Sequence, residues 1–150
     1  MRPEFIVRPA SPPDSKDISQ LSAQLGYPAP PVAIRKRLSA IGKSRDHAVF
    51  IAETSEGSVA GWVHIFIRIS VESDRFAEIG GLVVDEAHRT AGIGRLLVKA
   101  CEGWARKKKC ASVRVRTNVM RKETHQFYEN LGYAIQKSQT VFQKKLARRA

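Results

Sequence analysis

The segment from residue 82 to residue 105 constrains the fold of this chain more than any other. It opens with the apolar run LVV, which suits a strand buried on both faces. A loop with Gly92 and Gly94 follows. From Ile93 onward the apolar residues recur at the i, i+3, i+4 spacing of a helix packed on a sheet. The pattern predicts a buried strand, a tight glycine-containing loop and a helix that covers the sheet.

The rest of the chain alternates between strand-like and helix-like stretches. Strands are expected at residues 5–8, 47–53, 58–70, 77–85, 111–118, 133–136 and 140–146. Helices are expected at residues 14–25, 32–42, 93–105 and 123–131. The order β-α-α-β-β-β-α-β-α-β-β predicts an α/β (α+β) fold with a mixed sheet. A length of 150 residues fits one domain spanning residues 1–150.

Composition narrows the class of protein. A hydrophobic content of 43% and a charged content of 27% are typical of a globular domain. No apolar run approaches the ~20 residues of a membrane span, and the first residues do not resemble a signal peptide. We therefore expect a cytoplasmic protein without a membrane partner. The two cysteines, Cys101 and Cys110, have no metal or redox spacing, so we expect reduced thiols and no metal.

Charge is distributed unevenly along the chain. Residues 1–88 carry a net charge of −1 and residues 89–150 carry +13, which together give +12. A basic half favours a polyanionic ligand, either nucleic acid or a phosphate-rich cofactor. The basic runs at residues 107–109 and 144–149 have no interleaved aromatic residues for base stacking. We interpret them as solvated charges and do not expect nucleic-acid binding.

The glycine loop has a specific physical meaning. The first N–H groups of a helix have no partner within the helix, and the helix dipole adds partial positive charge there. Gly92 and Gly94 lack the side chains that would keep a phosphate away from these groups. The spacing is neither that of a P-loop nor that of G-x-G-x-x-G. A second interpretation is that the glycines only form a tight turn or allow close helix–sheet packing.

Two motifs together carry a family resemblance. Arg89-x-x-Gly92-x-Gly94, after a strand that ends in Val-Val-Asp, resembles the acetyl-CoA loop of the GNAT superfamily of N-acetyltransferases. Downstream, Asn118 on a strand and the helical run FYENLGY, residues 127–133, resemble the second signature of that superfamily. The resemblance covers nearly the whole chain. It implies a mixed, mostly antiparallel sheet of about seven strands flanked by about four helices.

The resemblance also implies a set of residues that contact acetyl-CoA. They are Leu82, Val83, Val84, Arg89, Thr90, Ala91, Gly92, Ile93, Gly94, Arg95, Asn118 and Tyr128. In this scheme the loop binds the pyrophosphate, and a main-chain N–H near Val83 or Val84 polarises the thioester carbonyl. Asn118 binds the pantetheine arm, and Tyr128 protonates the leaving thiolate.

Each assignment has a structural alternative. Tyr128 could be a core-edge aromatic residue, Asn118 could cap a helix, and Arg89 could be a solvated surface charge. Glu78 is the best candidate for the catalytic base, since it lies on the strand that leads to the loop. It could equally lie on a solvated or substrate-binding face, with a water as the base. Glu53, Asp85 and Glu86 are weaker candidates.

The function implied by the resemblance is transfer of an acetyl group from acetyl-CoA to a primary amine by direct attack in a ternary complex. The acceptor is a small-molecule amine, a peptide N-terminus or a lysine, and it enters beside residues 25–39 and 136–142. Dimers are common in the superfamily, so a homodimer is one state the resemblance allows. The alternatives are a non-catalytic acyl-CoA-binding regulatory module and a basic nucleic-acid-binding protein.

Overall fold

The computed structural model describes residues 4–89, 91–117 and 122–148. Two compact units make up the chain, residues 1–116 and residues 117–150. Within the described residues, the first unit holds the sheet and three α-helices. The second holds one α-helix and an extended segment.

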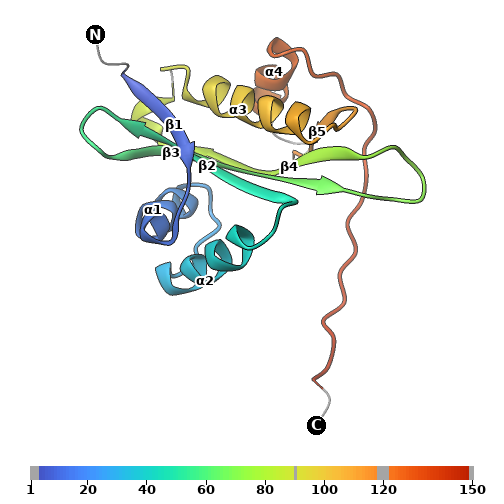
Figure 1. The fold of residues 1–150 in the computed structure, drawn as a ribbon, viewed down its shortest axis with the longest axis horizontal. Coiled ribbons are helices and arrows are strands. Elements are labelled where there is room, and N and C mark those ends of the chain that lie inside the picture. Colours follow the sequence, from blue (N-terminus) through green and yellow to red (C-terminus); the bar gives the residue numbers. More distant parts are fainter. Residues whose placement is uncertain (1–3, 90, 118–121, 149–150) are drawn as a thin grey trace. The chain divides into compact units, whose positions relative to one another are not determined.

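The first unit is built on a five-stranded sheet with the order β1-β2-β3-β4-β5 (Figure 1). The strands are β1 (Phe5–Pro9), β2 (His47–Thr54), β3 (Val59–Arg68), β4 (Phe76–Val84) and β5 (Val113–Val115). Neighbouring strands pair antiparallel, except that β4 and β5 run parallel. The predicted mixed, mostly antiparallel sheet is confirmed.

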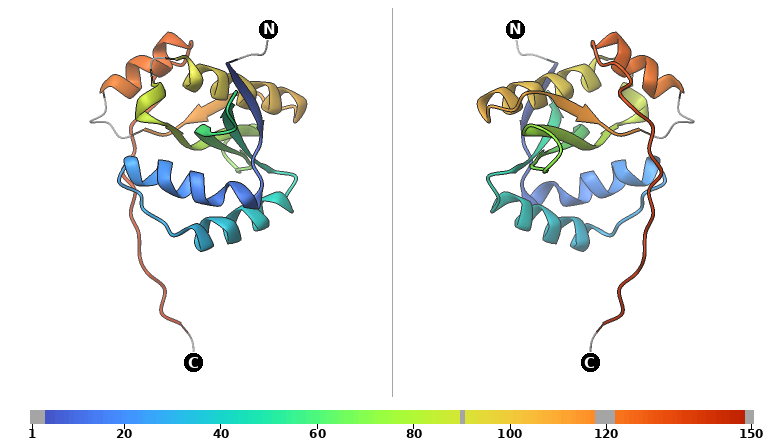
Figure 2. Two further views of the ribbon diagram at one scale, coloured as in Figure 1. Left: turned by 90° about the vertical axis from the view of Figure 1, so that its left-hand side faces the viewer. Right: turned by 90° about the vertical axis from the view of Figure 1, so that its right-hand side faces the viewer.

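Helices cover both faces of this sheet (Figures 1 and 2). α1 (Ser15–Gln24) and α2 (Pro31–Gly42) lie on one face, and α3 (Ile93–Lys107) lies on the other. Two short 3₁₀ helices, η1 (Pro12–Asp14) and η2 (Glu86–His88), precede α1 and follow β4. None of the helices in the described ranges is long and apolar enough to cross a membrane.

The face of β3 that carries Gly61 packs against α3. A Cβ placed on Gly61 would lie 2.9 Å from the carbonyl oxygen of Val83 and 3.2 Å from side chains of Ile93 and Leu97. Only a residue without a side chain fits this contact. Three buried residues continue the same face along the strand: Val63, Ile65 and Ile67.

The opposite face of β3 packs against α1 and α2. Trp62 begins this face and contacts a buried cluster made of Ile18, Ile34, Leu38 and Ile51. The two apolar faces of the sheet therefore each have their own helical cover, which is the layered arrangement that an α/β pattern predicts.

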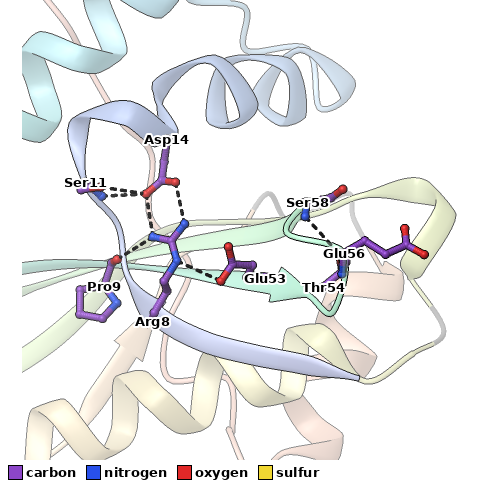
Figure 3. A network of polar contacts seen from close by, with 8 residues as sticks. All are labelled: Arg8, Pro9, Ser11, Asp14, Glu53, Thr54, Glu56 and Ser58. Atoms are coloured by element: carbon purple, nitrogen blue, oxygen red, sulfur yellow. Dashed lines mark hydrogen bonds and ion pairs between the residues drawn. The ribbon is translucent and has the colours of Figure 1, made fainter. Parts of the chain in front are cut away.

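A polar network fixes the start of α1 to the sheet (Figure 3). The guanidinium of Arg8, on β1, donates hydrogen bonds of 2.9 and 3.0 Å to the two carboxylate oxygens of Asp14. It also lies 3.4 Å from the carboxylate of Glu53 on β2. The bond from Arg8 lowers the pKa of the Asp14 carboxyl, and the N–H of Ser11 donates to the same carboxylate. These bonds hold the turn between β1 and α1.

The second unit contains α4 (Lys122–Asn130). Its last turn closes through a hydrogen bond from the N–H of Tyr133 to the carbonyl oxygen of Tyr128, with Gly132 at a φ of +94° between them. Such a left-handed glycine is the usual stop signal of a helix. The predicted helix over residues 123–131 is thus confirmed to within one residue at each end.

Two predicted strands, at residues 133–136 and 140–146, are wrong. The structure assigns no strand pairing to residues 133–148, which run as an extended segment (Figure 1). Their large apolar side chains are exposed: Ile135, Val141, Phe142 and Leu146. A strand needs a neighbour for its backbone groups, and alternation in the sequence does not supply one. The described sheet therefore has five strands rather than about seven.

Candidate functional site

The carboxyl half of β4 extends beyond its parallel neighbour. Pairing with β5 covers only residues 77–79 of β4, whereas pairing with β3 continues to Val84. Leu82 and Val84 are half-buried and Val83 is buried. Among the described residues, the β5-side main-chain groups of residues 80–84 therefore have no ladder partner. An unpaired strand edge can offer N–H and C=O groups to an extended ligand.

A β-bulge lies at the point where the two strands part. The register between β3 and β4 shifts at Gly80, between the pairs His64–Gly81 and Ile65–Ile79. A Cβ on Gly80 would lie 2.7 Å from the ring of Phe66. One on Gly81 would lie 2.9 Å from the ring of Trp62. A larger residue at either position would displace the aromatic ring that lies over it.

The loop after β4 is held by α1. Gln24, the last residue of that helix, donates a hydrogen bond to the carboxylate of Asp85 at 3.2 Å and accepts one from the N–H of Glu86 at 3.1 Å. The same carboxylate accepts from the N–H of Ala87 and lies 3.3 Å from Nδ1 of His88. These contacts position η2 and the start of the glycine loop.

Gly92 forms the N-cap of α3 in the left-handed conformation, with a φ of +81°. A Cβ placed on it would meet nothing within 4 Å, so no packing contact explains the absence of a side chain. Gly94 is the second residue of the helix. Of the predicted loop residues, Ile93 is buried in the core while Ala91 and Arg95 are exposed. Thr90 lies outside the described residues.

The geometry of Gly92 bears on the two interpretations of the loop. The left-handed φ fits the interpretation of a tight turn, and the open space at the Cβ argues against close packing at Gly92. The same open space leaves room for an anion beside the N-terminus of α3. Arg89 is exposed and lies 3.8 Å from the carboxylate of Glu86, at the outer limit of an ion pair. Such a weak surface pair leaves its guanidinium available to a phosphate.

Glu78 lies on β4, two residues before the bulge, and only 5% of its surface is exposed. Its Oε1 accepts a hydrogen bond of 2.9 Å from Arg116, and its Oε2 lies 3.7 Å from Arg68. The carboxylate of Glu78 therefore contacts two arginines and lies on the sheet face opposite α3.

Tyr128 lies on α4, in the second unit, and is buried. Its ring makes edge-to-face contacts with Phe127 and Tyr133, at centroid distances of 4.9 and 5.8 Å. Asn118 lies outside the described residues. The structure thus places the strand edge, the loop and Glu78 in one unit and describes Tyr128 in the other.

The sequence did not predict the hydrogen bonds from Gln24 to the loop after β4, nor the contact between Gly80 and the ring of Phe66. Neither had a usable signal, because both contacts join residues far apart in the sequence. The described residues contain no group of three or more His, Cys, Asp or Glu side chains placed to hold a metal ion.

In the first unit, an unpaired strand edge leads into a glycine-capped helix N-terminus, on a mixed sheet covered by helices. The sequence matches the acetyltransferase (GNAT) family over residues 16–133. This match spans well over half of the chain, so the chain belongs to the acetyltransferase (GNAT) family. GNAT acetyltransferases use acetyl-CoA as the acetyl donor.

Solved structures share this fold. The aminoglycoside 6'-N-acetyltransferase AAC(6')-Ih from Acinetobacter baumannii is 18% identical, with a TM-score of 0.83 over 95% of this chain and 99% of that one. AAC(6')-Iy, in complex with a bisubstrate analog, is 20% identical, with a TM-score of 0.84 over 96% and 100% of the two chains.

A third similar structure has a different description. A transcriptional regulator from Bacillus halodurans is 20% identical, with a TM-score of 0.83 over 93% of this chain and 99% of that one. Identities this low show the fold and leave the acceptor open. No curated protein matches the sequence.

Proposed function

We propose that this protein transfers the acetyl group of acetyl-CoA to a primary amine by direct attack within a ternary complex. The observation that carries the proposal is Gly92, a left-handed N-cap with open space around it at the start of a 15-residue helix. Family membership supports the same donor.

The loop at residues 89–95 would hold the pyrophosphate of acetyl-CoA through main-chain N–H groups and the dipole of α3. The β5-side edge of β4 at residues 82–84 would bind the pantetheine arm. A main-chain N–H of this edge, on the part next to the bulge at Gly80 and so within reach of Glu78, would stabilise the oxyanion. Such an effect is worth about 3–4 kcal/mol in other acyl-transfer sites. Asn118 is assigned to the pantetheine arm by the family signature alone.

Acid–base chemistry completes the proposal. A lysine-like amine has a pKa near 10.4, so its neutral form at pH 7 costs about 4.6 kcal/mol. Glu78 would accept that proton, directly or through a water, since it lies on β4 two residues before the bulge. Tyr128 would donate a proton to the leaving thiolate. Holding donor and acceptor together supplies about 7–11 kcal/mol, which exceeds either proton transfer.

Cys101 is not suited to carry the acetyl group as a cysteine-linked intermediate. Cys101 is fully buried in α3, and burial raises the pKa of its thiol to about 12. A thiol with that pKa supplies almost no thiolate nucleophile at neutral pH.

The test is a panel of amines incubated with the protein and acetyl-CoA, with release of free CoA thiol as the readout. The panel spans polyamines, aminoglycosides, amino acids and peptides. Amine-dependent thiol release is expected for one class. Binding of acetyl-CoA with no release for any amine would instead indicate a non-catalytic acyl-CoA-binding module.

A further inference from the structure

Two arginines contact one buried carboxylate on the sheet face opposite α3, and a third arginine lies on the same face. Arg116 and Arg68 contact Glu78 at 2.9 and 3.7 Å. Arg114 lies in register with Glu78, and its guanidinium carbon lies 3.8 Å from the ring centroid of Phe76. Among the described residues, the side chains of Arg68, Arg114 and Arg116 thus belong to the same face of the sheet as the carboxylate of Glu78.

The negatively charged side chain of this group is buried, whereas the positively charged ones are partly exposed. The side chain of Glu78 is 6% exposed, whereas those of Arg68 and Arg116 are 44% and 48% exposed. A ligand that approaches this face therefore meets guanidinium groups before it meets the carboxylate. Guanidinium groups bind carboxylate and phosphate oxygens in paired, charge-assisted hydrogen bonds.

These arginines are too distant to serve the pyrophosphate of the donor. From Glu78 to Val84, β4 advances six residues, or about 20 Å at ~3.3 Å per residue. The glycine loop begins beyond that strand end. The arginine group lies instead beside the bulge at Gly80, about 7 Å along the strand from Glu78.

An aromatic surface connects the arginine group to the bulge. Phe66 is the register partner of Glu78, and its ring covers Gly80. His47 stacks on Phe66 and the ring of His64 is tilted against it, each with a ring-centroid distance of 5.3 Å. A compact apolar body could pack here with its anionic group on the arginines.

We infer that the acceptor of the proposed acetyl transfer is a small amine that carries an oxyanion group, carboxylate or phosphate, which Arg68 and Arg116 bind. This inference rests on the proposed function. It disfavours polycationic acceptors such as aminoglycosides and polyamines, because their remaining ammonium groups would lie beside like charges. It gives this chain an acceptor class different from the one in the names of its aminoglycoside-modifying structural neighbours.

The test compares matched pairs of acceptors. Phenylalanine is assayed against phenethylamine, β-alanine against ethylamine, and phosphoethanolamine against ethanolamine, with an aminoglycoside as a further probe. In each pair the oxyanion-bearing amine is expected to have the higher kcat/KM, by about tenfold or more for a charge-assisted contact. The carboxylate and phosphate pairs show which oxyanion is bound.

The variants Arg116→Gln and Arg68→Gln should reduce that preference toward unity. The ratio of the two kcat/KM values within a pair is unaffected by a general loss of folding or of Glu78 function, because such a loss lowers both values equally. Arg106→Gln is the control for loss of one charge, since Arg106 is exposed on α3. It should keep the preference of the wild type.

The outcomes separate this inference from the proposed function. Equal or better turnover of the uncharged partner, the aminoglycoside or peptide amines overturns the inference and leaves acetyl transfer standing. A preference for the oxyanion that survives both arginine variants also overturns it. Absence of turnover with every amine overturns the proposed function as well.

Discussion

The carboxylate of Glu78 accepts a hydrogen bond of 2.9 Å from the guanidinium of Arg116, which joins the middle of β4 to the residue that follows β5. This bond lies next to the point where the two strands part, since their pairing covers only residues 77–79 of β4. This hydrogen bond therefore links β4 to the end of β5 where the two strands separate. It also fixes the orientation of Glu78, the proposed proton acceptor.

Glu78→Gln tests that acceptor role. The amide keeps the size of the side chain but cannot take a proton, so kcat should fall about 10²-fold while KM for acetyl-CoA changes little. Steady-state kinetics with a competent amine measures both constants. An unchanged kcat would leave Glu78 with a purely structural role and favour a water as the base.

Tyr128→Phe tests the proposed acid. Removal of the hydroxyl should lower kcat about 10²-fold with a modest effect on KM for acetyl-CoA, because the ring contacts with Phe127 and Tyr133 are kept. Tyr133→Phe is the control, since it removes a hydroxyl from the half-buried ring that packs against Tyr128 in the same unit. Equal kcat values for Tyr128→Phe and the wild type would remove Tyr128 from the acid role.

Gly61→Ala tests the packing of β3 against α3. The added methyl would lie 2.9 Å from the carbonyl oxygen of Val83, a backbone atom that cannot move alone, so we expect a loss of about 1–3 kcal/mol in the free energy of unfolding. Gly103→Ala, inside α3 with open space at its Cβ, should instead gain about 0.5–1 kcal/mol. Urea unfolding measures both. Equal effects of the two substitutions would contradict this packing.

His64→Phe tests the pH dependence of stability. Burial and the neighbouring His47 lower the pKa of His64 from 6.5 to about 4. The unfolded chain therefore takes up a proton at a higher pH than the folded chain. Stability falls as the pH drops from about 6.5 to about 4, by at most about 1.4 kcal/mol per pH unit.

The variant removes this titration while it keeps an aromatic ring beside Phe66. Between about pH 7.5 and about pH 5, urea unfolding should show a smaller loss of stability for the variant than for the wild type. Parallel losses in the two proteins would show that His64 does not titrate as described.

The sequence predicted those elements whose signal is local. The apolar spacing from Ile93 and the alternation of residues 63–67 each specify an element and its buried face, and both are confirmed. The order of elements along the chain as far as α4 was predicted from such local patterns. The family was predicted as well, since two motifs at a fixed separation identify it.

Contacts between distant segments were not predictable in this way. No residue near Gln24 in the sequence indicates its hydrogen bond to Asp85. No residue near Gly80 indicates that the ring of Phe66 lies against it. The segment at residues 140–146 shows the opposite failure, because its alternation indicated a strand although the structure provides no pairing partner for it. The proposed roles of Asn118 and Tyr128 stay predictions from the family signature.

The most direct test of the central claim is a thermal-shift titration with acetyl-CoA on Gly92→Glu and its matched control Gly57→Glu. Both glycines have a left-handed φ, +81° and +88°, and open space at the Cβ, so the two substitutions cost similar backbone strain. Only the first places a carboxylate at the N-terminus of α3.

Acetyl-CoA should raise Tm for the wild type and for Gly57→Glu, since a ligand present at about 100 times its Kd stabilises the folded state by about 2.7 kcal/mol. Gly92→Glu should show no rise at the same concentration. A rise for Gly92→Glu equal to that of the wild type would contradict the placement of the donor at this loop.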